Sequence, residues 1–109
     1  MHARMIEVSL KPGKHEEFLK LVVERLPFAR QSPGFVDAVG FTPENAHDRF
    51  VGIMFWKSNS DAEKYANGPG KQFIEKVKPF AQGEPRFEAL NVSVSTMRSV
   101  EADHAVAVG

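Results

Sequence analysis

The chain has 109 residues, of which 42% are hydrophobic, and it carries 14 basic and 14 acidic side chains. This length fits a single domain with its own core. The zero net charge argues against a nucleic-acid-binding protein, which usually has a basic excess, and against a polybasic membrane anchor. Because there is no cysteine, disulfides, thiolate metal sites and a cysteine nucleophile are excluded.

The sequence contains no pattern that predicts export or membrane insertion. The N-terminal residues lack the apolar segment of a signal peptide. No apolar run approaches the roughly 20 residues that span a bilayer. We therefore predict a cytoplasmic protein.

The first half of the chain changes from a strand pattern to a helix pattern and back. Residues 4–10 alternate with the two-residue period of a strand, which a Pro-Gly pair then ends. From Lys14 to Ala29 the apolar residues fall at helical spacing. Pro27 lies within that pattern, so it should either kink the helix or end it early. Two strands follow, over residues 35–42 and 49–56, and their short polar connection predicts an antiparallel hairpin.

A second helix is predicted after this hairpin. Ser60 with Glu63 fits a capping box at its start, and Ser58 with Asp61 is a looser alternative. A Gly-Pro-Gly segment interrupts the helix, and its Pro69 suits the first position of a renewed helical stretch.

The order of elements, completed by a strand over residues 87–97, is β-α-β-β-α-β. This order predicts an α+β, ferredoxin-like fold, in which a four-stranded antiparallel sheet carries its helices on one face. We assign residues 1–98 to this domain. Residues 99–109 form a C-terminal tail that is either flexible or packed on a partner subunit.

The two central strands predict a homodimer because both of their faces are apolar. One face of the third strand should carry Phe50, Met54 and Trp56, and the other Val51, Ile53 and Phe55. In the second strand, we expect Phe35, Val39 and Phe41 on one side together with Asp37. Helices cover only one face, so the other needs a cover, most simply the same sheet of a second copy. The tail folding back is the alternative.

Three short motifs resemble the antibiotic biosynthesis monooxygenase family in their order and spacing. Pro-Gly followed by Phe18 resembles the family's entry into its first helix, and Ser-Pro-Gly-Phe at 32–35 its entry into the second strand. Trp-Lys-Ser at 56–58 resembles the exit from its third strand. The resemblance implies a dimeric α+β barrel that holds a small aromatic or polyketide-like molecule between sheet and helices.

The resemblance also implies a chemistry. Quinone-forming members of the family are monooxygenases that use dioxygen without flavin, metal or haem, so no cofactor is expected. Related members degrade haem, isomerise small molecules or only bind them. The haem-degrading relatives carry a ligand histidine in the second helix, and this chain has none there, so we do not predict haem degradation.

Trp56 and Tyr65 are candidate site residues. Trp56 matches the family's strand-end tryptophan, which could stack on a flat substrate and donate its indole N–H, or could simply pack against a helix. Tyr65 could orient a ligand through its hydroxyl, or be a half-buried helix aromatic. The quinone-forming pattern has an asparagine and a tyrosine where this chain has Gly52 and Ala62. Gly52 could enlarge the pocket.

His15 and Arg86 complete the candidate set. His15 could accept a proton if it faces the pocket, although a solvated helix N-terminus explains it as well. Arg86 could bind a substrate carboxylate or enolate, or be an ordinary strand-edge residue. The histidines show no metal-ligand spacing, so no metal site is predicted.

Two hypotheses about function follow. The first is a cofactor-independent monooxygenase that holds an electron-rich aromatic as a carbanion in a dry pocket, where it reacts with dioxygen. The second is a non-catalytic, small-molecule-binding dimer, which the missing polar pair at Gly52 and Ala62 favours.

Overall fold

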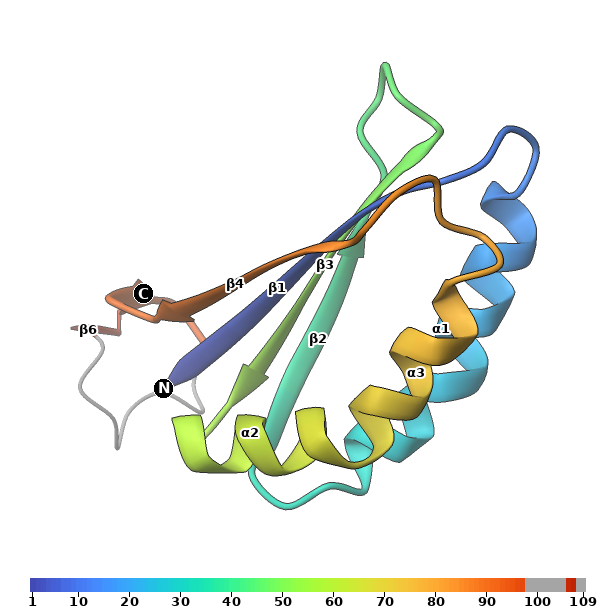
Figure 1. The fold of residues 1–109 in the computed structure, drawn as a ribbon. Coiled ribbons are helices and arrows are strands. Elements are labelled where there is room, and N and C mark those ends of the chain that lie inside the picture. Colours follow the sequence, from blue (N-terminus) through green and yellow to red (C-terminus); the bar gives the residue numbers. More distant parts are fainter. Residues whose placement is uncertain (98–105, 108–109) are drawn as a thin grey trace.

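The computed structural model describes residues 1–97 and 106–107. The main elements are β1 (His2–Ser9), α1 (His15–Arg30), β2 (Phe35–Phe41), β3 (Arg49–Trp56), α2 (Asn59–Asn67), α3 (Pro69–Val77) and β4 (Arg86–Asn91). The four strands pair antiparallel in the order β2-β3-β1-β4. The helices lie on one side of this sheet (Figure 1). The predicted ferredoxin-like α+β fold is therefore confirmed.

In both helical regions the structure excludes one of the two alternatives that the sequence left open. α1 does not end early at Pro27 but continues to Arg30, and the Pro27 carbonyl accepts a hydrogen bond from the Gln31 N–H at 3.0 Å. The cap of α2 is Ser58 and not Ser60. The Ser58 hydroxyl accepts from the Asp61 N–H at 3.1 Å and donates to the Asp61 carboxylate at 2.9 Å. α3 begins at Pro69, as predicted.

The last strand is shorter than the sequence predicts. β4 ends at Asn91, which pairs with His2, the first residue of β1. One further backbone hydrogen bond follows, in which the Val92 N–H donates to the Met1 carbonyl at 3.0 Å. The chain then forms a separate two-stranded parallel pair, β5 (Val94–Ser95) with β6 (Val106–Ala107). Apart from β6, the predicted tail lies outside the described residues.

A β-bulge near the start of β2 changes which residues share a face. Phe35 pairs with Trp56 and Asp37 with Phe55, so the register shifts between these two pairs. Phe35 therefore faces the helices with Trp56, whereas Val39 faces the opposite side of the sheet. The prediction that Phe35 shares a face with Val39 was wrong, because a bulge adds one residue and inverts the alternation.

The core between sheet and helices consists of two clusters at opposite ends. One is centred on Phe18 and Phe50 and also contains Val8, Leu10, Val77 and Ala81. The other contains Trp56, Tyr65, Ala29 and Ala62. Within the described residues, no helix is long and apolar enough to cross a membrane. The cytoplasmic location stays a prediction.

Candidate functional site

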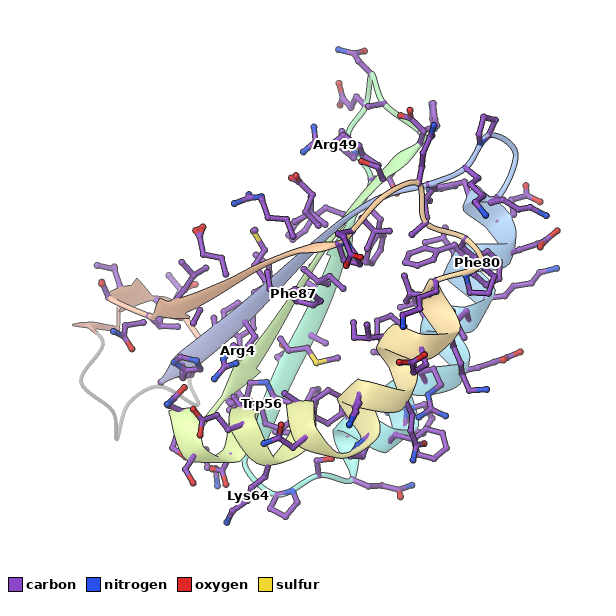
Figure 2. The ribbon with its side chains drawn as sticks, viewed as in Figure 1. Arg4, Arg49, Trp56, Lys64, Phe80 and Phe87 are labelled. Atoms are coloured by element: carbon purple, nitrogen blue, oxygen red, sulfur yellow. The ribbon has the colours of Figure 1, made fainter. Side chains whose placement is uncertain are left out.

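A cavity of about 650 Å³ lies between the sheet and the helices. This volume is in the range of small-molecule sites. Apolar side chains from both layers line most of it, among them Ile6, Met54, Phe87, Val22, Leu26, Phe73 and Ile74. Phe87 (labelled in Figure 2) and Lys71 are exposed on β4 and α3, respectively. Both line the cavity, which places its mouth between this edge strand and α3.

Trp56 and Tyr65 form the wall at one end of the cavity, so the structure brings these two candidates together. Their ring centroids are 5.0 Å apart, and Phe35 packs on Trp56 from another side at 5.7 Å. Trp56 is only 1% exposed, so little of its ring is left for a ligand to stack on. Gly70 allows Tyr65 to lie this close, because a Cβ there would be 2.8 Å from the tyrosine ring.

Tyr65 separates this cavity from a second, smaller one. The second cavity has about 370 Å³ and lies between α1 and α2, with Phe28 and Lys64 among its lining residues. Burial raises the pKa of the Tyr65 hydroxyl above its usual value, although Arg25 opposes the effect. The hydroxyl is therefore protonated at neutral pH and is able to donate a hydrogen bond.

Gly52 does not open extra space in the cavity. It pairs with Gly40 across β2 and β3, and the ring of Phe50 lies against both glycines. A Cβ at Gly52 would be 3.0 Å from Phe50 Cε2, and one at Gly40 would be 2.8 Å from Phe50 Cζ. The volume that the two missing side chains leave is filled by this ring, which also packs on Phe18 at 5.0 Å.

Arg4 is a cavity residue that we did not predict. It lies on the helix-facing side of β1, between Met54 and Ala89 of the neighbouring strands, and lines the cavity. Figure 2 shows it at the same end of the molecule as Trp56. The signal was present in the sequence, because Arg4 has the same parity as the inward-facing Ile6 and Val8.

The neighbours of Arg4 hold its guanidinium in place. Arg4 Nε donates to His2 Nε2 at 2.7 Å, and Nη2 donates to Asn59 Oδ1 at the start of α2, also at 2.7 Å. His2 is 8% exposed, and burial first and Arg4 second lower its pKa, which the Asn91 side chain and Glu63 partly oppose. The imidazole is therefore neutral at pH 7 and can accept the hydrogen bond from Arg4.

This arrangement predicts that stability falls as the pH drops below 6.5, the usual histidine pKa. The unfolded chain then binds a proton that the folded chain resists, because the pKa of His2 is lowered by folding. Denaturation midpoints measured from pH 8 to pH 5 should decline, and the decline should be smaller in His2→Gln, which keeps an acceptor for Arg4. The denaturation midpoint of His47→Gln, a substitution on an exposed loop, should decline as much as that of the parent. A His2→Gln curve parallel to the parent's would contradict the assignment.

His15 lies away from the cavity. Its Nε2 is 3.0 Å from the Thr42 hydroxyl, and its ring meets that of His47 edge-on at 6.2 Å. It is not among the residues that line the cavity. In the described part of the chain, no three histidine, aspartate or glutamate side chains gather where they could hold a metal ion.

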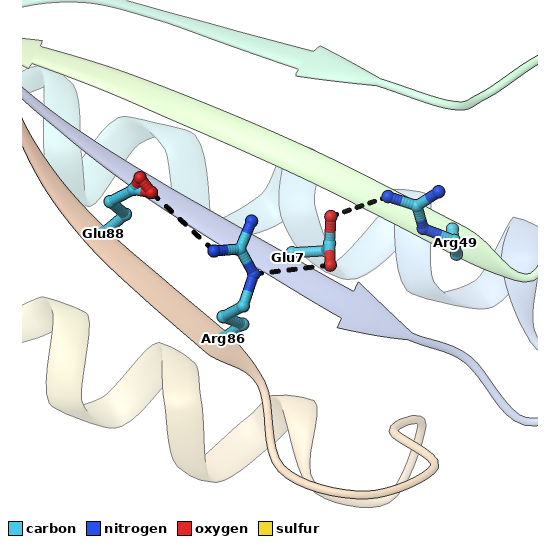
Figure 3. A network of polar contacts seen from close by, with 4 residues as sticks. All are labelled: Glu7, Arg49, Arg86 and Glu88. Atoms are coloured by element: carbon cyan, nitrogen blue, oxygen red, sulfur yellow. Dashed lines mark hydrogen bonds and ion pairs between the residues drawn. The ribbon is translucent and has the colours of Figure 1, made fainter.

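Arg86 lies on the opposite face of the sheet from the cavity. Its Nε is 3.6 Å from Glu7 Oε1, and its Nη1 is 3.7 Å from Glu88 Oε1. Arg49 donates to the other oxygen of Glu7 at 2.6 Å (Figure 3). This hydrogen bond from Arg49 is the main reason that the pKa of Glu7 is lowered. Arg86 thus has carboxylate partners of its own and does not face the cavity.

Comparisons with known proteins agree with this fold. A family model described as antibiotic biosynthesis monooxygenase matches residues 1–76. No curated protein matches the sequence. Among solved structures, the chain is similar to a variant of SnoaB, a cofactor-independent oxygenase from Streptomyces nogalater, with 14% identity and a TM-score of 0.74 over 84% of this chain and 91% of that chain.

Two further solved structures have the same fold. A conserved protein from Methanosarcina mazei has 14% identity and a TM-score of 0.75 over 84% of this chain and 92% of that chain. A protein of unknown function from Nitrosomonas europaea has 14% identity and a TM-score of 0.71 over 82% of this chain and 85% of that chain. The family model covers more than half of the sequence, and the chain therefore belongs to the antibiotic biosynthesis monooxygenase family.

Proposed function

We propose that the protein is a cofactor-independent monooxygenase that oxidises a small aromatic or polyketide-like substrate with dioxygen. The observation that carries the proposal is the cavity of about 650 Å³, which is mostly apolar and ends at Trp56 and Tyr65. An apolar site of this kind keeps water away from a reactive carbanion and strengthens the few polar contacts within it.

The reaction needs no external reductant. An activated ring CH₂ group loses a proton, the carbanion reacts with dioxygen, and loss of water leaves a carbonyl. One oxygen atom enters the product, the other leaves as water, and the four electrons that the carbon loses reduce dioxygen. Tyr65, protonated and buried, offers a hydrogen bond to the substrate oxygen that carries the negative charge.

Oxygen consumption by the purified protein with an anthrone is the direct test. Tyr65→Phe keeps the ring and removes the hydroxyl, so kcat/KM should fall about 10-fold to 100-fold if that hydroxyl stabilises the anion. Ser60→Ala, an exposed position on the same helix, should keep the parent rate. A parent protein that consumes no more oxygen than buffer does with anthrones or dihydroxy-aromatics would overturn the proposal.

The second candidate function, binding without catalysis, is favoured by the position of His15 outside the cavity. Among the described residues that line the cavity, the carboxylates are Glu75, which is exposed on α3, and Glu88, whose side chain pairs with Arg86 on the other face of the sheet. A ligand that raises the melting temperature in the same anthrone series without oxygen consumption would favour this alternative over the oxygenase.

We also propose that the protein is a homodimer joined through the sheet face that the helices leave uncovered. That face carries an apolar band across three strands, from Val39 and Phe41 through Val51 and Ile53 to Met5. Val39 and Phe41 are 43% and 49% exposed in the single chain. A continuous apolar face of this kind is rare on monomers, and a two-fold axis would cover it with its own copy.

A further inference from the structure

Arg4 is a cation in an otherwise largely apolar wall. It projects from the helix-facing side of β1, where its neighbours Met54 and Ala89 are apolar, and it is only partly exposed. Placing a charge in such surroundings is unfavourable unless a partner compensates it. Whether the charge of Arg4 is available to a ligand therefore depends on whether its partners within the protein neutralise it.

The partners of Arg4 within the protein are neutral. Nε and Nη2 donate to the imidazole of His2 and to the amide oxygen of Asn59. Among residues 1–97, Arg4 forms no ion pair with a carboxylate, whereas Arg49 and Arg86 both pair with Glu7. A guanidinium has five N–H donors, and these two bonds use two of them. Positive charge and free donors are thus left for a molecule in the cavity.

The two neutral partners also fix the direction of the guanidinium. His2 is buried beside Arg4, and Asn59 opens α2 on the other side. Glu63, an acidic residue on α2, accepts a 3.4 Å hydrogen bond from Asn59 and forms none with Arg4. A side chain held in this way loses little further entropy when it binds a ligand, which raises the affinity of the bond.

We propose that Arg4 makes the cavity selective for planar aromatic molecules that carry an anionic oxygen, which is either a carboxylate or an ionised phenol or enol. The apolar walls take the ring, and the guanidinium takes the charge, since arginine binds such oxygens with parallel N–H donors. This inference deepens the proposed function, because it uses the same cavity and names the class of substrate. It does not depend on catalysis.

Lys71 is the other cation at the cavity, and it provides the matched control. It is exposed at the mouth on α3, with the acidic Glu75 one turn further along the same helix. An exposed charge is screened by water and contributes little to binding. Selectivity for an anion should therefore depend on Arg4 and not on Lys71.

Two probes of the same shape separate charge from ring: 2-naphthoate, which is anionic, and 2-naphthamide, which is neutral. Isothermal titration calorimetry with the full chain should give an affinity for naphthoate about tenfold or more above that for naphthamide. Arg4→Gln should remove about tenfold of the naphthoate affinity and leave naphthamide within about twofold. The naphthoate affinity of Arg4→Lys should lie between those of the parent and Arg4→Gln. Lys71→Gln should change the affinity for neither probe by more than about threefold.

The location of binding can be read from one signal. Trp56 is the only tryptophan, so its indole N–H gives a single nitrogen–proton cross-peak at the end wall of the cavity. Both probes should shift this peak during the titration. The comparison of the two probes on the parent protein needs no variant, so it holds even if Arg4→Gln fails to fold.

The outcomes separate this inference from the proposed function. Equal affinity of the parent for both probes, or a naphthoate preference that survives Arg4→Gln, overturns the role of Arg4 alone. Charge-selective binding of the probes, together with no oxygen consumption with anthrones, supports the role of Arg4 and overturns the oxygenase. Probes that leave the Trp56 peak unmoved overturn the role of Arg4 in this cavity, whereas the oxygenase is still judged by the anthrone assay.

Discussion

Ile53→Asp is expected to yield a folded monomer, whereas the parent should have twice the 12.1 kDa mass of the chain. Ile53 lies at the centre of the uncovered sheet face, between Met5 on β1 and Val39 on β2. At a two-fold interface the substitution buries two carboxylates without cations. The dimer should weaken by about 1,000-fold or more, because each buried unpaired charge costs several kcal/mol.

The measurement is light scattering coupled to size-exclusion chromatography over a range of concentrations, with circular dichroism to show that the variant is folded. Val23→Asp is the matched control, because Val23 is 65% exposed on α1, away from the sheet. It should stay dimeric. A parent protein that has the mass of one chain at every concentration would refute the dimer.

Gly52→Asn, which restores the asparagine of the quinone-forming pattern, is expected to destabilise the protein strongly. A Cβ at this position would already be 3.0 Å from Phe50 Cε2 and 3.2 Å from Ile6 Cγ2. The amide would then have to displace the Phe50 ring or be buried against it. We expect a loss of about 3 kcal/mol, since overpacking and polar burial act together, and a melting temperature lower by about 10 °C or more.

A second substitution tests the cause. Phe50→Leu alone should destabilise by about 1–2 kcal/mol, because it removes a buried ring from the core. If the clash is with that ring, Phe50→Leu and Gly52→Asn together should cost clearly less than the sum of the two. Strictly additive costs would show that Phe50 is not the obstacle. In the proposed oxygenase reaction, the substrate anion would therefore be stabilised by groups other than an asparagine at position 52.

The order of elements was predictable because hydrophobic periodicity and the proline and glycine residues that end helices and strands are local properties of the sequence. Pro69 starts α3 because a proline suits the first turn of a helix whatever surrounds it. Trp56 and Tyr65 could be placed together for the same reason, since a strand end and the helix that follows it are close in the chain. The bulge at Phe35 could not be predicted, because it appears only when β2 is paired with β3.

The candidate site was predicted in part, because alternation along a strand tells which residues share a face but not which face is covered. Arg86 was assigned to the site, yet it pairs across the sheet with Glu7, which is distant in sequence. Arg4 lies on the covered face and was overlooked, although it alternates with Ile6 and Val8. A charged residue in phase with an apolar inner face is the pattern that would have found it.

The position of the cavity mouth bears on how such a protein can evolve. The well-packed cluster around Phe18 and Phe50 lies at one end of the layer, and β4 and α3 border the mouth with exposed residues such as Phe87 and Lys71. Mutations at these border positions can reshape the opening while the cluster keeps its contacts. Substitutions along β4 and α3 should therefore be tolerated, whereas substitutions beneath Phe50 should be selected against because they cost stability.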